Sequence, residues 1–404
     1  MRVAIVAGSD AGHAFPAFAL AERFIAAGDE PTVYTGLRWS AAARRRGIEI
    51  AELPELAAVD TDDDADAGQK LSVRAARMAR ALAPVIAAAD HDLVISDVIT
   101  VAGGWAAELC ALPWIELSPH PLYQPSRGLP PIGSGLAVGT GLRGRCRDAV
   151  LRALSATSVR AGERQRAAAR ATLHLPGPGS TPDARFVATL PGLEVYRPDW
   201  PVATHLIGPL LWEPTDEVFD RPDGTGPLIV IAPSTAVTGA ADMVSSALAA
   251  LAPEKLGCAV RVVISALDRP DVEAVGLGAS LIAGLGRQDE ILTHADLTIC
   301  GAGHGMLAKA LAAGVPVVTV PGGGDQWELA NRVARTGAGT VVRPVTPESI
   351  REAVRTILTD RRYRAAARRV ADSAHDVVDP VAVARRVVHR NRSGRRVRKV
   401  GSCD

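Results

Sequence analysis

The sequence has little that would direct the protein to a membrane, to an oxidising compartment or to nucleic acid. No apolar run reaches the roughly 18 residues of a membrane span. The short run after Met1 soon meets Asp10 and glycine, so we interpret it as a buried strand rather than a signal peptide. The five cysteines are scattered without a C-x-x-C pair, which favours reduced thiols in the cytoplasm and argues against a zinc site. A net charge of +1 gives no reason to expect nucleic acid.

Aromatic residues are also scarce, at 4% of the chain, whereas hydrophobic residues together reach 48% and charged residues 22%. This composition is typical of a soluble globular protein. A length of 404 residues is long for one hydrophobic core and predicts two or three domains. The segment 212–227 is rich in proline, glycine and acidic residues, and we interpret it as the linker between domains.

The first part of the chain alternates between short apolar runs and segments of helical composition, which predicts a parallel, doubly wound α/β sheet. The Pro- and Gly-rich segment 119–144 is too long for an idle connection and is predicted to cover a binding site. The acidic loop 60–66 is interpreted as solvated surface rather than as a metal site. Predicted strands lie at 3–7, 32–34, 48–50, 93–96, 114–117 and 204–207, and predicted helices at 15–27, 39–46, 71–89, 102–110 and 147–173.

The same alternation resumes at residue 228 and predicts a second domain of the same class. The basic and polar end, 389–404, is interpreted as a disordered tail, with anion binding as the alternative. Predicted strands lie at 228–232, 260–265, 280–283, 297–300 and 315–320, and predicted helices at 239–252, 347–359, 361–374 and 381–390.

The strongest functional signal is a glycine-rich turn that follows the apolar run ending at Cys300. Gly301, Gly303 and Gly305 let backbone N–H groups at the start of the next helix approach an anion, and the helix dipole favours phosphate there. We therefore expect a diphosphate site. Asp325-Gln326 follows the next strand at the same carboxyl edge of the sheet, and its carboxylate and amide groups suit sugar hydroxyls.

The order of motifs around this turn resembles the donor-binding signature of nucleotide-sugar-dependent glycosyltransferases of the GT-B fold, the family of the macrolide, glycopeptide and plant natural-product enzymes. The order is Q-x-x-I-L-x-H from Gln288, the glycine cluster, A-L-x-x-G-V-P and P-x-x-x-D-Q. The resemblance implies two facing Rossmann-like domains with a cleft between them. It assigns acceptor binding to residues 1–211 and nucleotide-sugar binding to residues 228–380. It also implies that residues 381–404 form a helix that packs back on the first domain, followed by a basic tail.

The resemblance also implies a reaction: inverting transfer of a hexose-type sugar from UDP or dTDP to a hydroxyl of a small hydrophobic acceptor, such as a natural product or lipid, without a metal or other cofactor. His13 matches the family's catalytic base, and Asp97 matches the aspartate that orients it. From the residues alone, His13 could instead cap a helix, and Asp97 could be a turn residue. The implied donor-binding residues are Thr235, Gln288, Gly303, His304, Gly305, Asp325 and Gln326.

Departures from the family pattern leave alternatives open. Gly301 stands where the family has a diphosphate-binding histidine, and Lys309 stands where a glutamate is common; Arg287 or Lys309 could supply the lost positive charge. One alternative is therefore a degenerate homologue that binds a ligand or assists a partner enzyme without transferase activity. A dehydrogenase is disfavoured because Met306 stands where the dinucleotide fingerprint needs a third glycine. An epimerase of the same fold and peripheral membrane contact also stay open.

Overall fold

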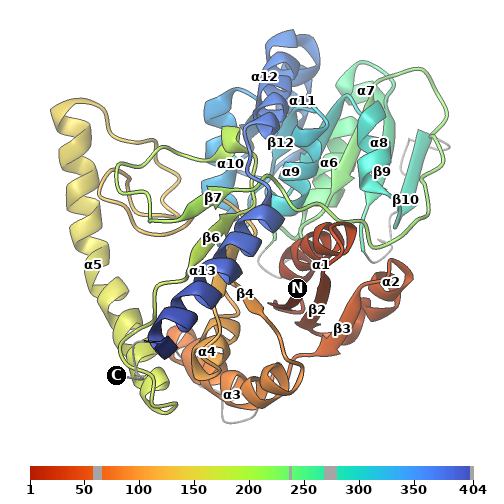
Figure 1. Cartoon of the computed structure of the whole chain (residues 1–404). Helices are drawn as coiled ribbons and strands as arrows, with labels where there is room; N and C mark the ends of the chain where they lie inside the picture. The colour runs from red at the N-terminus through yellow and green to blue at the C-terminus, as the bar shows by residue number, and fades with distance from the viewer. Residues whose placement is uncertain (58–65, 236–238, 268–279, 401–404) are drawn as a thin grey trace.

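The computed structural model describes residues 1–57, 66–235, 239–267 and 280–400, and the side chains up to residue 393. Its two parallel, doubly wound sheets confirm the predicted fold class (Figure 1). The acidic loop predicted at 60–66 lies outside the described residues except for Asp66, whose side chain accepts a hydrogen bond from the Gln69 N–H at the start of a helix.

The first sheet has seven parallel strands in the order β3-β2-β1-β4-β5-β6-β7. Alternate residues of β1 enter different cores: Val3 and Ile5 pack beneath the first helix, whereas Ala4 and Val6 pack on the opposite face. Its strands are β1 (Arg2–Val6), β2 (Glu30–Thr35), β3 (Glu49–Glu52), β4 (Leu93–Asp97), β5 (Trp114–Ser118), β6 (Ala184–Val187) and β7 (Thr204–Leu206). Its helices are α1 (Ala11–Ala26), α2 (Ser40–Arg45), α3 (Ala67–Ala88), α4 (Ala102–Leu109) and α5 (Gly141–Ala171), with 3-10 turns η1 (Leu37–Trp39) and η2 (Pro191–Leu193).

The second sheet has six parallel strands in the order β10-β9-β8-β11-β12-β13. Its strands are β8 (Leu228–Ala232), β9 (Arg261–Ser265), β10 (Leu281–Gly284), β11 (Leu297–Cys300), β12 (Val317–Thr319) and β13 (Gly339–Val341). Its helices are α6 (Met243–Leu251), α7 (Pro253–Leu256), α8 (Gln288–His294), α9 (His304–Ala312), α10 (Gln326–Thr336), α11 (Pro347–Thr359) and α12 (Arg361–Asp372), followed by the turn η4 (Ser373–His375).

Each sheet has one point where the strand order reverses, between β1 and β4 in the first and between β8 and β11 in the second. Loops at the carboxyl ends of strands on either side of such a point diverge, which leaves room for a ligand. The β1–α1 turn and the end of β4 lie at the first reversal, and the β11–α9 glycine turn lies at the second. The topology thus places the residues singled out from the sequence where α/β proteins bind ligands.

The last helix, α13 (Pro380–Val400), leaves the second domain and crosses the first (Figure 1). Val383, Ala384 and Val387 join the hydrophobic core that β1 and α1 form. Arg392 pairs with Asp92 at 2.5 Å. The interpretation of 389–404 as disordered was wrong up to Val400, because arginine is a good helix former and Arg392 ties this segment to Asp92 of the first domain; residues 401–404 lie outside the described chain.

Two strands have no counterpart among the sequence predictions, β6 and β13. Both are short, and β13 begins with a glycine, so neither shows a periodic pattern. Within the described residues no helix combines the length and apolar character needed to cross a membrane. No group of three or more His, Cys, Asp or Glu side chains in that part of the chain is arranged to hold a metal ion.

Candidate active site

His13 and Asp97 are hydrogen-bonded to each other at the strand-order reversal of the first sheet. His13 lies in the first turn of α1, and Asp97 is the last residue of β4. The His13 Nδ1 to Asp97 Oδ2 distance is 2.5 Å. The other carboxylate oxygen of Asp97 accepts a hydrogen bond from the Ile99 N–H at 3.0 Å. Because the Asp97 side chain is only 1% exposed, while His13 is 19% exposed, the carboxylate is held inside and the imidazole reaches the surface.

The environment of His13 shifts its pKa upward. Burial acts against the charged imidazolium and lowers the pKa, but the hydrogen bond and charge of Asp97, with smaller contributions from Asp10 and Asp325, outweigh burial and raise it above 6.5. The hydrogen bond to Asp97 requires a proton on Nδ1 when the carboxylate is ionised. Neutral His13 therefore presents a lone pair on Nε2, which is the form that a general base needs.

A second imidazole, His120, lies in the same region and was not identified from the sequence. Its Nδ1 donates to the Pro121 carbonyl at 2.8 Å, and its ring stacks on Tyr123 with centroids 4.3 Å apart. Burial lowers the pKa of His120 and outweighs the hydrogen bond to Pro121 and the charge of Asp325, which act in the opposite direction. The signal that could have found it is its place, two residues beyond β5 at the carboxyl edge of the sheet.

The loop after β5 belongs to the first domain and makes hydrogen bonds with the second. The Tyr123 hydroxyl donates to Asp325 Oδ2 at 3.5 Å, and further along the Gly135 N–H donates to Glu328 on α10 at 2.9 Å. Arg335 of the same helix donates to the Gly135 carbonyl at 2.9 Å. The segment 119–144, which was predicted to cover a binding site, thus lies against the helix that begins directly after Asp325.

The glycine turn of the second domain exposes the start of α9. Gly303 is the N-cap residue, and a side-chain carbon added at Gly303 or Gly305 would have no neighbour within 4 Å. The backbone N–H groups of this first turn are therefore accessible to an anion. Ala302, fully buried, has φ = 63°, a left-handed conformation that costs a non-glycine residue roughly 1–2 kcal/mol.

His304, predicted to contact the donor, points toward the first domain. Its Nε2 lies 2.9 Å from Thr189 Oγ1. Burial lowers the pKa of His304 to about 3, with the charge of His120 acting in the same direction, so the imidazole is neutral at physiological pH. A neutral ring that is hydrogen-bonded across the domains cannot replace the positive charge of an imidazolium beside a diphosphate.

Asp325 and Gln326 have different surroundings, although they are adjacent. Asp325 is exposed at the start of α10. Gln326 is 3% exposed, and its amide is used within the loops: Oε1 accepts from the Gly322 N–H and Nε2 donates to Ser234 Oγ, both at 2.8 Å. Asp325 is therefore accessible to a ligand, whereas Gln326 fixes the turn that presents it. Thr235, also predicted to bind the donor, is exposed after β8.

Gln288 belongs to a buried polar cluster with Lys309 and the linker residue Glu213. Lys309 Nζ lies 2.7 Å from Glu213 Oε1, and it donates to Gln288 Oε1 at 2.9 Å and to the Trp212 carbonyl at 3.0 Å. Glu213 also accepts from the backbone N–H groups of Gln288 and Asp289 at the start of α8. Glu213 was not identified from the sequence, where it was read only as part of a polar linker.

Arg287 and Lys309 were the two residues that could have supplied the positive charge lost at Gly301. Both are engaged in contacts elsewhere. Lys309 is 8% exposed and has the partners just described. Arg287 pairs with Asp289, with Nη2 and Oδ2 2.6 Å apart. The described site thus offers a diphosphate the backbone of α9 rather than a side-chain cation from these two residues.

Comparison with known proteins matches residues 250–389 to the C-terminal domain of the erythromycin biosynthesis protein CIII-like family. The 4'-demethylrebeccamycin synthase of Lentzea aerocolonigenes is 27% identical over 94% of this chain and 98% of its own length. Among solved structures, the calicheamicin glycosyltransferase superposes with a TM-score of 0.70 at 19% identity, covering 96% of this chain and 97% of its own. A Streptomyces sp. SF2575 glycosyltransferase complexed with thymidine diphosphate has a TM-score of 0.66 at 19% identity, covering 96% and 99%.

Proposed function

We propose that this chain, which belongs to the natural-product glycosyltransferases of the GT-B fold, transfers a sugar with inversion from a nucleoside diphosphate to a hydroxyl of a small hydrophobic acceptor. The observation that carries the proposal is the His13–Asp97 pair at 2.5 Å, with Asp325 of the second domain close enough to act on the pKa of His13. A base and a sugar-binding carboxylate in one region are what direct displacement at an anomeric carbon requires.

In the proposed reaction the acceptor oxygen attacks the anomeric carbon while its proton passes to His13 Nε2. The bond from the anomeric carbon to the diphosphate oxygen breaks, its electron pair leaves with the diphosphate, and the configuration at carbon inverts. Asp97 keeps the Nδ1–H in place and stabilises the imidazolium that forms. This division of roles uses both oxygens of Asp97, one to orient His13 and one to hold the Ile99 N–H.

For the donor, we propose that the diphosphate binds at the start of α9, where the open surroundings of Gly303 and Gly305 allow close approach. The helix dipole and free N–H groups stabilise the charge that develops on the leaving group. Asp325 accepts hydrogen bonds from sugar hydroxyls. Gln288 and Thr235 contact the nucleotide, and Gln326 acts through the shape of its turn.

We propose UDP or dTDP as the nucleotide carrier. Support for dTDP comes from structural relatives, two of which were solved with this nucleotide, a Streptomyces sp. SF2575 glycosyltransferase and the glycosyltransferase VinC. Support for a hydrophobic acceptor comes from relatives named for their acceptors, such as the spinosyn rhamnosyltransferase complexed with spinosyn aglycone.

The test is calorimetric titration with dTDP, UDP and GDP, followed by a transfer assay on a panel of hydrophobic alcohols and phenols. Gly303→Val should abolish nucleotide binding, because the added carbons enter open space in front of α9 rather than a packed interior. Gly162→Val on α5, where the space is equally open, is the matched control and should bind normally. A chain that binds none of the three nucleotides at millimolar concentration would instead be a degenerate, non-catalytic homologue.

A further inference from the structure

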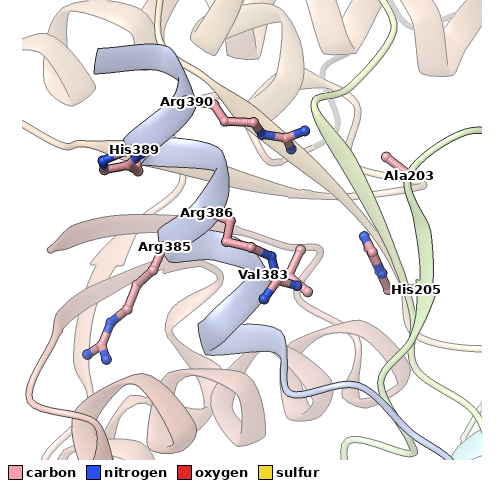
Figure 2. Close-up of a pocket in the computed structure, with 7 residues that line it drawn as sticks. All are labelled: Ala203, His205, Val383, Arg385, Arg386, His389 and Arg390. Carbon is pink, nitrogen blue, oxygen red and sulfur yellow. The ribbon is translucent and has the colours of Figure 1, made fainter. Parts of the chain in front are cut away.

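A cavity of 580 Å³ opens between α13 and the edge strand β7, and none of its lining residues belongs to the candidate active site. Ala203 and Val383 supply apolar surface, and the polar side chains that line it are basic (Figure 2). A cavity with one sign of charge and a partly apolar wall is suited to a small anion or to the charged end of an amphiphile.

Two arginines of α13 face this cavity. Figure 2 shows Arg386 and Arg390 on the side of the helix toward β7, with His205 across from them, whereas Arg385 and His389 point the other way. The arrangement follows from helix geometry, because residues four apart lie on one face about a turn apart.

The arginines on α13 differ in their partners. Arg385 pairs with Asp29 at 3.0 Å and Arg392 pairs with Asp92 at 2.5 Å, so both hold the helix to the first domain. In the described part of the chain, Arg386 and Arg390 have no ion pair or hydrogen bond with another residue. Two like charges at this spacing disfavour the helix, and no carboxylate offsets them here.

The pKa of His205 reflects the positive charge around the cavity. Burial lowers the pKa of His205, and the charges of Arg386 and Arg390 lower it further. No carboxylate contributes in the opposite direction. The imidazole is therefore neutral at physiological pH and can donate or accept a hydrogen bond without adding to the repulsion.

We propose that this cavity binds a phosphate group, with Arg386 and Arg390 donating to its oxygens and His205 hydrogen-bonded to it. Planar guanidinium groups match phosphate oxygens in pairs, and a dianion offsets both unpaired charges. The phosphate belongs either to a free small molecule or to a lipid head group whose apolar part lies along the half-buried Ala203. The binding is separate from sugar transfer and does not require the active site.

The test follows the His205 pKa by NMR on protein labelled at histidine Cε1, with the signal assigned by its loss in His205→Gln. Inorganic phosphate, added against a chloride control of equal ionic strength, should raise the pKa of His205 in a saturable manner. Arg386→Gln/Arg390→Gln should raise this pKa without phosphate and weaken the phosphate response roughly tenfold or more. Arg361→Gln, at an exposed position of α12 outside the cavity, is the control and should respond like the wild type.

Sedimentation with phosphatidylcholine vesicles that contain phosphatidic acid distinguishes the two sources. If the wild-type protein sediments with the vesicles and the Arg386→Gln/Arg390→Gln variant does not, the ligand is a lipid head group. If the His205 signal responds to inorganic phosphate in a saturable manner but the protein does not bind vesicles, the ligand is a free phosphate compound. The proposal is overturned if the double variant responds like the wild type, if chloride alone has the same effect as phosphate, or if neither phosphate nor vesicles change the His205 signal.

Discussion

Replacing Asp97 by asparagine is a sharp test of the proposed base, because the variant keeps the size of the side chain and changes its hydrogen bonding. Both oxygens of Asp97 accept hydrogen bonds, from His13 Nδ1 and from the Ile99 N–H. Asparagine has only one such oxygen. If that oxygen keeps the Ile99 N–H, the amide group faces His13 and can only donate, so Nδ1 must accept and the proton moves to Nε2.

This change of tautomer removes the Nε2 lone pair that takes the acceptor proton in the proposed mechanism. We expect turnover to fall by about 10²–10⁴, the range that a positioned general base contributes. Affinity for the nucleoside diphosphate, measured by calorimetry, should stay within about twofold, because the change is made in the other domain. Nitrogen-15 NMR of His13 would show the tautomer directly, and an acceptor phenol that is ionised at the assay pH should recover most of the rate, since it needs no base.

The same variant should change how stability depends on pH. The folded-state pKa of wild-type His13 is raised above 6.5, so its contribution to the free energy of unfolding is complete below pH 6.5 and is lost as the pH rises through the folded pKa. A hydrogen bond to a charged group contributes about 1.5–3 kcal/mol. Urea unfolding should therefore show the largest gap between wild type and Asp97→Asn at low pH, and a smaller one as His13 loses its proton.

Two results would refute this account of the dyad. One is an Asp97→Asn enzyme with near-normal turnover on an un-ionised acceptor. The other is a strictly multiplicative loss when Asp97→Asn is combined with His13→Ala, because a base and its orienting residue act as one unit and cannot each impose a full penalty.

Three further predictions concern the second domain. Asp325→Ala should weaken binding of the sugar nucleotide but leave the free nucleoside diphosphate nearly unaffected in calorimetry, and equal losses for both would place the carboxylate away from the sugar. Lys309→Met leaves Glu213 buried without its cation and should lower the free energy of unfolding by about 3–5 kcal/mol in urea; if the buried charge is the cause, adding Glu213→Gln recovers much of this loss. Ala302→Gly relieves the left-handed backbone and should raise the free energy of unfolding by up to about 1 kcal/mol, whereas a clear decrease would show that φ = 63° is not strained here.

The sequence predicted the fold well because continuous apolar strands and helices alternate along most of the chain. Val3 to Val6 or Ile229 to Ile231, buried on both faces of a sheet, leave such a pattern in the sequence itself. β6, which reads ARFV, and β13, which reads GTV, lack such a continuous apolar run, so nothing in their own residues marks them as buried strands. The tail was misjudged because its charged composition hides both the helix propensity of arginine and the tertiary contact of Arg392 with Asp92.

Site residues at the end of a strand, or in the first helical turn beyond it, could be located from the sequence, because strand ends in a parallel sheet share one edge. His13 and Asp97 are of this kind, although only the structure shows their contact. The roles of Gln326 and Glu213 could not be read in this way. Each depends on bonds to residues distant in sequence, Ser234 for the first and Lys309 for the second, and no local pattern specifies such partners.

Gly301 stands where the family has a diphosphate-binding histidine, and this difference is what left a non-catalytic homologue open. The structure gives a reason for glycine at this position. A side-chain carbon at this position would lie 2.9 Å from Ser234 Cβ, closer than real side chains approach. Ser234 in turn accepts the hydrogen bond of Gln326 that fixes the turn before α10, with Asp325 at its start. A histidine at 301 would therefore displace the support of Asp325, so in this chain the two features compete for the same space. The absence of the histidine thus has an explanation in the packing of Ser234 and Gln326 around the turn, and in the proposed donor site the diphosphate relies on the backbone of α9 instead.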